Sequence, residues 1–595
     1  MTDGHGQLLT TSSTGSSGGR PQVTGTHGVV SSGHHLASGI GLDVLKRGGN
    51  AFDAAAAVGF ALTVLMPQQN GLGGEVPILV SQRGSAQIEA LSGDAIAPRA
   101  ATVEYFRNLD VELIPFDGLL PALVPPAPAT WLLLLERYGS LRLADVLEPA
   151  LDLAEHGFPI YDDLSDAIAR QAPRFRREWP SSARKFLFDG RVPRVGEVWK
   201  QPALAHTFRR LIQAEASSSE RQRGLRAAHE AFYRGEIARQ IVAFAQGTAV
   251  LDATGRAHTG LLTLADLENF SARVEPAVAV DYRGVQVHKC GPWTQGPALL
   301  QTLQLLEGFE LSKLGFGSVD YFHLIIEALK LAFADREFHY GDPRFVNVDI
   351  NRLLSKSYAN ERRRLIDPHR ASLELRPGGY PAIRARHQAD VERSRTEHPR
   401  HGDTTKLEVI DQAGNIVSAT PSGGWLKGSP VIEELGFPLG TRGQMFSLCP
   451  EHPNVIAPGK RPRTTLTPSI ASRAGRAFLA FGSPGGDAQD QWALQFLLAV
   501  LDFGLSLQQA TEVPTVTSLH WPASFYPRTA EPGVVLAESR IPSDVLSALR
   551  DRGHDVRELA AFSGGNTLAA SIDRDHGVFA GAASPRLDPA YAVAW

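Results

Sequence analysis

Hydrophobic and polar positions along the chain follow two periods, and each period predicts one type of element. Leu36, Ile40 and Val44 recur at helical spacing, and a glycine pair follows them as a stop signal. Asn50 is a suitable cap for a second, alanine-rich helix. After a glycine-rich loop, apolar runs within residues 76–91 predict two strands. The first part of the chain is therefore expected to form two helices and a strand pair.

The same patterns extend over the rest of the chain. Residues 174–224 are charged and show neither period, so an irregular stretch is predicted there. Further helices are predicted across 131–170, 298–306, 321–332 and 488–501, and further strands across 277–288, 407–419, 477–481, 567–572 and 578–582. Because strands alternate with helices in both halves, a layered α/β or α+β fold is expected.

Composition narrows the class of protein. The chain of 595 residues is 43% hydrophobic and 21% charged, which is typical of a globular protein. Its net charge of -4 gives no reason to expect nucleic acid or an acidic membrane surface as a partner. The two cysteines, Cys290 and Cys449, exclude a disulfide framework and are typical of a reducing compartment.

The sequence predicts neither a secretory signal nor a membrane span. Residues 1–28 are rich in Ser, Thr and Gly and lack an apolar core, so a disordered tail is expected. The longest apolar run, residues 51–66, is interrupted by Asp53 and Gly59. We therefore expect a soluble, cytoplasmic protein.

A basic segment precedes the most informative junction in the chain. Residues 360–400 interleave Pro, Arg and His and hold a single aromatic residue, Tyr380, which favours a mobile linker over a nucleic-acid patch. An alternating pattern begins at Thr404, and residues 411–415 form the turn of a predicted hairpin. If the chain is cut between Asp403 and Thr404, the threonine becomes a new amino terminus. Its hydroxyl can then act as a nucleophile and its α-amine, with an ordinary pKa of about 7.7–8.0, as the base.

A second candidate feature is the run Pro484-Gly485-Gly486, between a predicted strand and a predicted helix. Backbone N–H groups at such a helix start can bind an anion or the oxyanion of a tetrahedral intermediate. An ordinary strand-to-helix turn is the alternative. The motifs H-E-x-x-H, C-x-x-C and the Walker loop do not occur, and His34-His35 has no companion ligands. No metal and no cofactor is therefore predicted.

Short motifs along the chain converge on one family. They include Gly48-Gly49-Asn50-Ala51, Gly71-Leu72-Gly73-Gly74, Asp281-Tyr282-Arg283-Gly284, Asp403-Thr404-Thr405, Lys460-Arg461-Pro462, Gly482-Ser483-Pro484-Gly485-Gly486 and Ala583-Ser584-Pro585-Arg586. In this order the motifs resemble the γ-glutamyltranspeptidase family of N-terminal nucleophile hydrolases, from Gly28 to Trp595.

The resemblance implies an α+β fold, a four-layer αββα sandwich, and a precursor that cuts itself before Thr404. The Thr404 hydroxyl would attack the Asp403 carbonyl in an N→O acyl shift. The large fragment, 1–403, would consist of the tail 1–28 and a part of the composite core, 29–403, that ends in a mobile linker over about 360–403. The small fragment, 404–595, would stay bound to it as a heterodimer. Any higher assembly is left open.

The resemblance also implies roles for individual residues. Thr404 would form the acyl-enzyme, and Ser422 stands where the family has a threonine that hydrogen-bonds the nucleophile. Gly485 and Gly486 would supply the oxyanion N–H groups. The substrate pocket would include Gln444, and Thr464 and Thr465 stand where a serine pair binds the substrate carboxylate.

Three positions depart from the family pattern. Asp94 occupies the place of the arginine that grips the γ-glutamyl carboxylate, where a charged carboxylate would repel an anionic ligand. Ser447 replaces an aspartate that binds the substrate α-amino group, and Gly424 replaces a substrate-contacting asparagine. The machinery of acyl transfer is therefore kept while the glutamyl grip is altered. This pattern is similar to the cytoplasmic branch that includes relatives of oxamate amidohydrolase and cephalosporin-type acylases.

The main hypothesis is a self-processing enzyme with an N-terminal threonine, similar to γ-glutamyltransferases. It would hydrolyse or transfer the acyl group of small amides, such as glutathione, through an acyl-enzyme. The second hypothesis is a non-glutamyl amidohydrolase of the oxamate or cephalosporin type on the same scaffold. The third is a non-catalytic descendant, against which the presence of Thr404, Ser422 and Gly485-Gly486 argues.

Overall fold

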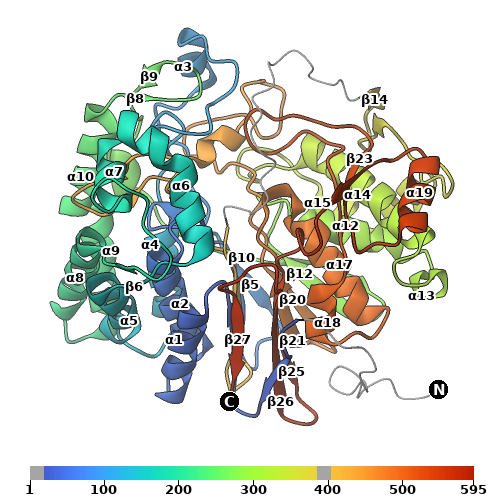
Figure 1. Cartoon of the computed structure of the whole chain (residues 1–595), viewed down its shortest axis with the longest axis horizontal. Helices are drawn as coiled ribbons and strands as arrows, with labels where there is room; N and C mark the ends of the chain where they lie inside the picture. The colour runs from blue at the N-terminus through green and yellow to red at the C-terminus, as the bar shows by residue number, and fades with distance from the viewer. Residues whose placement is uncertain (1–18, 385–403) are drawn as a thin grey trace.

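The computed structural model describes residues 19–384 and 404–595. Two seven-stranded antiparallel sheets occupy the centre of the molecule (Figure 1). The β15 sheet has the order β10 (Val274–Pro276), β5 (Ile88–Leu91), β4 (Ile78–Ser81), β16 (Ile416–Ala419), β15 (Leu407–Ile410), β2 (Val29–Ser32), β27 (Tyr591–Ala594). The β21 sheet has the order β1 (Val23–Gly25), β26 (Val578–Ala583), β25 (Leu568–Asp573), β21 (Arg476–Gly482), β20 (Ser469–Arg473), β12 (Val285–Lys289), β11 (Val278–Tyr282).

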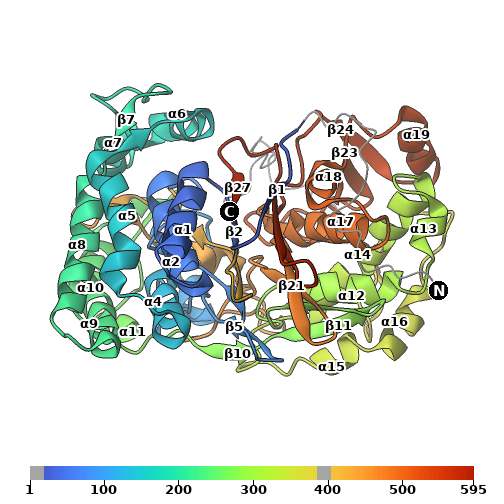
Figure 2. The same cartoon turned by 90° about the horizontal axis from the view of Figure 1, so that it is seen from below.

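Helices cover the outer face of each sheet, and the turned view shows the layers in sequence (Figure 2). Against the β15 sheet lie α1 (His35–Lys46) and α2 (Ala51–Leu65), with α4 (Ala127–Tyr138) and α5 (Leu143–His156) outside α2. Against the β21 sheet lie α12 (Pro297–Leu306), α17 (Gln489–Leu501) and α18 (Leu507–Glu512), with α14 (Val319–His339) outside α12. The order helix, sheet, sheet, helix confirms the expected αββα sandwich.

Shorter elements extend these layers. Further helices are α3 (Val103–Asn108), α6 (Asp162–Arg177), α7 (Pro180–Phe186), α8 (Pro202–Ala216), α9 (Arg221–Tyr233), α10 (Glu236–Gly247), α11 (Leu264–Glu268), α13 (Leu311–Leu314), α15 (Ile350–Leu353), α16 (Lys356–Arg363), α19 (Ser543–Asp551) and the 3-10 turns η1 (Arg442–Met445) and η2 (Gly486–Ala488). Small ladders join β3 (Gly74–Glu75) to β17 (Ser422–Gly423), β6 (Phe158–Pro159) to β7 (Val198–Trp199), β8 (Val250–Leu251) to β9 (Ala257–His258), β13 (Glu374–Leu375) to β14 (Ile383–Arg384), β18 (Val431–Ile432) to β19 (Phe437–Pro438), and β23 (Val534–Glu538) to both β22 (Val516–Ser518) and β24 (Asp555–Leu559). None of the described helices combines the length and apolar character that crossing a bilayer requires.

The apolar core follows the layers. One cluster fills the space between α2 and the β15 sheet, a second lies between the β21 sheet and its helices, and a third lies between the two sheets. Every residue of α2 is buried, which explains its apolar character on all sides. The predicted cap is present, because Asn50 Oδ1 accepts hydrogen bonds from the backbone of Phe52 and Asp53 at 2.9 and 3.0 Å.

Both sheets combine strands from the two sides of residues 385–403. The predicted hairpin places Val409 of β15 opposite Val417 of β16, and Val409 also pairs with Val30 of β2. In the β21 sheet, β12 likewise pairs with β20. A cut before Thr404 would therefore leave the two segments joined by continuous ladders of hydrogen bonds.

The irregular stretch predicted over 174–224 is wrong. Helices α7 and α8 and the start of α9 occupy most of it. In α8, Leu204, Phe208 and Leu211 are buried at helical spacing, while charged residues fill the exposed positions between them. The high charge of the stretch hid this narrow apolar stripe.

Two expected flexible segments are partly ordered. Within the predicted tail, Val23–Gly25 form β1 at the edge of the β21 sheet, opposite Phe579–Gly581 of β26. Residues 364–384 lie against α14, because Gly378 N donates to Asp335 Oδ1 at 2.7 Å and Ser372 O accepts from Lys330 Nζ at 2.9 Å. The same segment contacts His520, whose Nε2 lies 3.1 Å from Glu374 O. Residues 1–18 and 385–403 lie outside the described residues.

Candidate active site

Thr404 lies just before β15 and is buried. Its backbone N–H donates to Gln69 Oε1 at 2.8 Å, and its Oγ1 is 3.1 Å from Ser422 Oγ. A backbone bridge also joins Thr404 to Ser422. The structure thus brings together the two side chains that the resemblance pairs, whereas Asp403 lies outside the described residues.

Backbones approach closely beside this pair. Glu75 of β3 stands opposite Ser422 of β17. A Cβ atom at Gly74 would lie 2.1 Å from Ser422 O, and one at Gly424, where φ is +62°, would lie 3.0 Å from Gly74 N. Glycine at these positions allows the two loops to touch. A side chain at position 424 would have to displace the backbone of the facing loop.

A buried ion pair that the sequence did not predict adjoins Ser422. Arg442 Nη2 donates to Ser422 Oγ at 2.7 Å and to Glu75 Oε2 at 3.0 Å, and Arg442 Nε donates to the same carboxylate oxygen at 3.1 Å. Burial raises the pKa of Glu75, and the neighbouring Arg442 opposes that shift. In the sequence, the pair is marked only by its position next to other candidate residues. Glu75 follows a glycine-rich motif, and Arg442 precedes Gln444 by two residues.

Aromatic rings flank the Arg442 guanidinium. Its Cζ atom is 4.9 Å from the ring centroid of Trp425 and 5.8 Å from that of Phe525. Trp425 Nε1 in turn donates to Gln69 O at 3.0 Å. Because Gln69 also accepts from the Thr404 nitrogen, the Trp425 ring connects the guanidinium to the residue that contacts Thr404.

Asp94 is buried close enough to Glu75 and Arg442 for their charges to affect its pKa. Burial and the Glu75 carboxylate raise the pKa of Asp94 well above its ordinary value, against the opposing effects of Arg442 and Arg461. Among the described residues Asp94 Oδ2 has no hydrogen-bond partner. Both effects favour the uncharged form of the Asp94 carboxyl group.

Gly485 and Gly486 form the turn between β21 and α17. Their φ angles are +131° and +57°, conformations that favour glycine. The next residue, Asp487, forms an ion pair with Arg336 and accepts from Ser524 N at 2.7 Å. The turn is therefore held rigidly from one side, as a site for an oxyanion requires.

A buried pair connects the strand after Thr404 to that glycine turn. Lys406 Nζ lies 2.5 Å from Glu408 Oε1 and donates to Ser418 Oγ at 2.8 Å. Burial raises the pKa of Glu408 to about 7, while Lys406 opposes the shift. A Cβ atom at Gly482 would lie 2.4 Å from Lys406 Cε. The end of β21 thus packs directly on the side chain two residues beyond Thr404.

Two of the expected pocket residues have their polar groups engaged elsewhere. Gln444 Nε2 donates to Phe116 O at 3.3 Å, and Gln444 Oε1 accepts from Tyr526 N at 3.2 Å. The Ser447 hydroxyl is half-buried and accepts from Cys449 N at 3.1 Å. Both side chains therefore contribute hydrogen bonds to the loops around them.

The threonine pair lies near the glycine turn. Thr464 O accepts from Gln295 N at 2.8 Å, and Gln295 Nε2 donates to Gly486 O at 3.3 Å. Thr465 Oγ1 is buried and has no hydrogen-bond partner among the described residues. Thr464 Oγ1, by contrast, accepts from Leu466 N at 3.3 Å.

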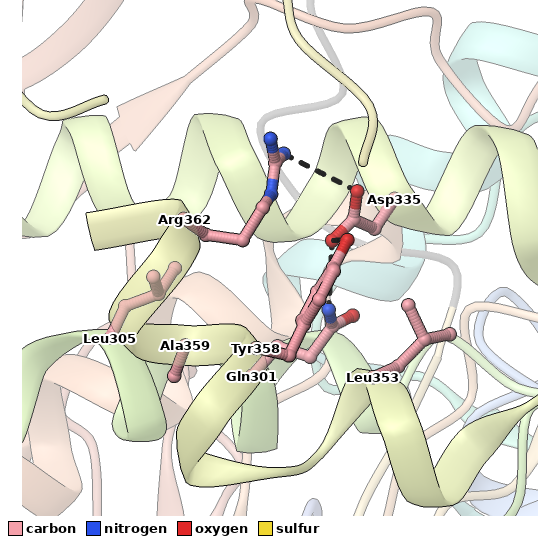
Figure 3. Close-up of a pocket in the computed structure, with 7 residues that line it drawn as sticks. All are labelled: Gln301, Leu305, Asp335, Leu353, Tyr358, Ala359 and Arg362. Atoms are coloured by element: carbon pink, nitrogen blue, oxygen red, sulfur yellow. Dashed lines mark hydrogen bonds and ion pairs between the residues drawn. The ribbon is translucent and has the colours of Figure 1, made fainter. Parts of the chain in front are cut away.

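A small cavity occurs elsewhere, in the helical layer of α12, α14, α15 and α16 (Figure 3). Asp335 Oδ2 accepts from Gln301 Nε2 at 2.9 Å and from Tyr358 OH at 2.8 Å. Asp335 Oδ1 accepts from Gly378 N at 2.7 Å and from Arg362 Nη2 at 3.3 Å. We call these five residues the Asp335 hub. Because four donors saturate its carboxylate, the hub is structural. Within residues 19–384 and 404–595, no three His, Cys, Asp or Glu side chains converge as a metal site would require.

Comparisons with known proteins agree with this geometry. The sequence model of the family described as Gamma-glutamyltranspeptidase matches residues 37–594. The Glutathione hydrolase-like YwrD proenzyme of Bacillus subtilis (strain 168) is 31% identical over 573 residues, which cover 96% of this chain and 98% of that protein.

Solved structures extend the likeness to the fold. The structure of LmbA2991HD is 44% identical, covers 96% of this chain and 99% of its own, and superposes with a TM-score of 0.91. The cephalosporin acylase from Bacillus halodurans is 32% identical, covers 99% of each chain and superposes with a TM-score of 0.83. Because the family match spans nearly the whole chain, the protein belongs to the γ-glutamyltranspeptidase family.

Proposed function

We propose that the protein is a self-processing amidase whose nucleophile is Thr404. One observation carries the proposal: two buried side chains hold the two reactive groups of Thr404 separately. Gln69 Oε1 accepts from the backbone nitrogen at 2.8 Å, and Ser422 Oγ lies 3.1 Å from the hydroxyl. After a cut before Thr404, this nitrogen becomes an α-amine that is already held beside the hydroxyl, as a base must be.

Maturation and turnover would use the same hydroxyl. In maturation, Thr404 Oγ1 attacks the Asp403 carbonyl, the amide bond to Thr404 breaks as an ester forms, and water hydrolyses the ester. In turnover, the hydroxyl attacks the carbonyl of a small amide, and the α-amine transfers its proton to the leaving amine. Water or an acceptor amine then removes the acyl group from Thr404. No metal or cofactor takes part in either reaction.

The N–H groups of Gly485 and Gly486 would stabilise the oxyanion in both reactions. Two contacts support this role. Asp487 holds the turn through Arg336 and Ser524, and Gly482 packs on Lys406 of the strand that follows Thr404. These contacts fix the turn relative to the nucleophile, which is the condition for preorganised stabilisation.

The mature protein would be a heterodimer of fragments 1–403 and 404–595. The mixed composition of both sheets supports this, since β15 pairs with β2 and β20 pairs with β12 across the cut. Separating the fragments would break ladders in both sheets and expose the core between them.

For the substrate, γ-glutamyl amides such as glutathione are the first class to test. Thr465 supports this class, because its unpartnered hydroxyl can bind a carboxylate. A non-glutamyl amide is the second candidate. It is favoured by the buried Asp94, by the engaged Ser447 hydroxyl, and by Gly424, which leaves no room for a side chain.

The cut and the nucleophile are tested together by Thr404→Ala. Denaturing electrophoresis of the wild-type protein should show two fragments, and the smaller should begin at Thr404 by amino-terminal sequencing. Thr404→Ala should remain intact and inactive. Thr405→Ser is the matched control, because it alters the adjacent threonine and should still be cut. An intact wild-type protein, or an active Thr404→Ala protein, would refute the proposal.

The substrate class is tested on the processed protein. γ-Glutamyl p-nitroanilide, oxamate and an acylated β-lactam amine should be compared by their kcat/KM values. Faster release from the γ-glutamyl compound supports the first class, and faster turnover of either other amide supports the second. Thr404→Ala serves as the blank for each assay.

A further inference from the structure

Glu75, Ser422 and Thr404 stand side by side on three adjacent segments. Ser422 is opposite Glu75 in the ladder of β17 and β3, and it is opposite Thr404 in a backbone bridge. Directly opposite residues of antiparallel segments place their side chains on the same face. The three side chains therefore form a row with Ser422 in the middle.

Arg442 closes this row from outside the ladder. Its Nη2 atom donates to Ser422 Oγ at 2.7 Å and to Glu75 Oε2 at 3.0 Å. A guanidinium can only donate, so Ser422 Oγ accepts on that side. The Ser422 hydroxyl can then donate its own proton to Thr404 Oγ1, 3.1 Å away, where negative charge develops as the nucleophile reacts.

Stability alone does not account for this ion pair. A buried pair is weak evidence for stability because desolvation offsets its attraction. Among the described residues, Glu75 Oε1 and Arg442 Nη1 are both buried without a hydrogen-bond partner. The pair therefore retains unmatched polar atoms beside the nucleophile, as is common at functional sites.

We propose that Glu75 and Arg442 are positioning residues for the nucleophile, and this inference rests on the proposed function of Thr404. Glu75 fixes the guanidinium of Arg442. The guanidinium orients the Ser422 hydroxyl toward Thr404 Oγ1 and places a positive charge one residue away from the reacting oxygen.

The charges near the pair allow a test in which two variants should shift the pH–rate profile in opposite directions. Asp94 and Arg461 lie near the pair, Arg461 binds Glu275 and Asp342, and Lys406 binds Glu408. Arg442 disfavours a second positive charge and so lowers the pKa of the mature α-amine, whereas Glu75 raises it. Loss of Arg442 alone should move the ascending limb of the pH–rate profile up by about one pH unit. Loss of Glu75 alone should move it down.

Four variants of the full chain test the inference: Arg442→Gln, Arg442→Lys, Glu75→Gln, and the double variant Glu75→Gln/Arg442→Gln. The first measurement is the rate at which the fragment beginning at Thr404 appears. The second is acylation of the matured protein by p-nitrophenyl acetate, whose acetyl group forms an ester with Thr404 Oγ1 as p-nitrophenolate leaves. This small probe needs no glutamyl grip. Circular dichroism checks the fold, and Thr404→Ala gives the background.

We expect acylation of Arg442→Gln to be slower than that of the wild type by about tenfold or more, and the ascending limb of its pH–rate profile to lie at higher pH. Glu75→Gln should shift the limb downward, and Arg442→Lys should recover part of the rate. In the double variant the ascending limb should lie close to the wild-type pH, because one charge of each sign is removed. Its acylation should remain slow, because the donor to Ser422 is weakened. Loosened packing would not give shifts of opposite sign.

The inference would be overturned if neither single variant shifted the ascending limb of the pH–rate profile, or if both variants shifted it in the same direction. Thr404 would still stand as the proposed nucleophile. Where a single variant does not mature, Arg442→Lys and the double variant decide, and equal rates in both would overturn the inference. A wild-type protein that neither cuts itself nor releases p-nitrophenolate above the Thr404→Ala background would instead refute the proposed function.

Discussion

The Thr404 site and the Asp335 hub are both buried clusters in which an arginine meets a carboxylate, yet their hydrogen bonding differs. In the hub, both oxygens of Asp335 accept two hydrogen bonds each, although Arg362 Nε is buried without a hydrogen-bond partner among the described residues. At the site, Glu75 Oε1, Arg442 Nη1, Asp94 Oδ2 and Thr465 Oγ1 have no such partner among the described residues.

This difference distinguishes two roles of buried polar groups, one in stability and one in activity. Each buried polar atom without a partner costs about 1–3 kcal/mol, so the site is less stable than a saturated cluster would be. The hub, whose carboxylate is saturated, instead holds the anchored segment, residues 367–384, against α14 through the hydrogen bond from Gly378 N to Asp335 Oδ1. Loss of a hub residue should therefore unfold the protein, whereas loss of a site residue should inactivate a folded protein.

The largest expected effect is on stability, from Asp335→Ala. This change leaves Arg362 buried without its carboxylate and removes the acceptor for Tyr358, Gln301 and Gly378. The free energy of unfolding should fall by about 3–5 kcal/mol, measured by urea unfolding. Tyr358→Phe, which removes one donor, is the milder control. A variant with unchanged stability and lost activity would contradict the structural role of the hub.

Ser422→Ala should show the converse behaviour. It removes the hydroxyl 3.1 Å from Thr404 Oγ1 and should slow self-cleavage and turnover by about 10²-fold, or ~2.7 kcal/mol in the barrier. Its unfolding midpoint should stay close to that of the wild type. Ser422→Thr keeps the hydroxyl and should retain most of the rate. If the alanine variant unfolds easily while its rate is normal, the comparison fails.

Acid should destabilise the hub side of the molecule. Burial lowers the pKa of His520 to about 3 and that of His554 to about 2. Both histidines are neutral in the folded protein, and in the unfolded chain they bind protons below about pH 6.5. Stability should therefore fall as the pH drops below 6.5, by up to about 1.4 kcal/mol per pH unit for each histidine.

Hydrogen exchange of the anchored segment measures this effect, since His520 Nε2 contacts Glu374 O. The segment should lose protection between neutral pH and about pH 5. His554→Gln, which removes one titrating group, should flatten the dependence of stability on pH. A segment that stays protected throughout this range would exclude the buried histidines as its acid-sensitive support.

The smallest expected effect comes from Gly424→Ala. At φ of +62°, the new Cβ would lie 3.0 Å from Gly74 N. The strain should reduce stability by about 1 kcal/mol and displace the loop that carries Ser422. Gly459→Ala is the matched control, because at φ of +73° it introduces similar backbone strain in open space, without a close contact. Equal losses of activity in both variants would show that the close contact at Gly424 has no special role.

Local elements and the reactive junction could be predicted from the sequence. The hairpin after Thr404, the Asn50 cap and the strand that precedes the Gly485-Gly486 turn all depend on residues a few positions apart. Capping, turn chemistry and periodicity act over this range. The helices within 174–224 were missed because an apolar stripe becomes visible only when its burial partner is known.

The sequence by itself determined the αββα family resemblance, the position of Thr404 and the residues expected around it. Tertiary structure alone decided the Glu75–Arg442 pair, whose members are 367 positions apart, and the raised pKa of Asp94. The physical reason is that ladder register and burial bring distant segments together, whereas residue spacing constrains only near neighbours. The proposed nucleophile is therefore visible in the sequence, while the groups proposed to orient it emerge only from the fold.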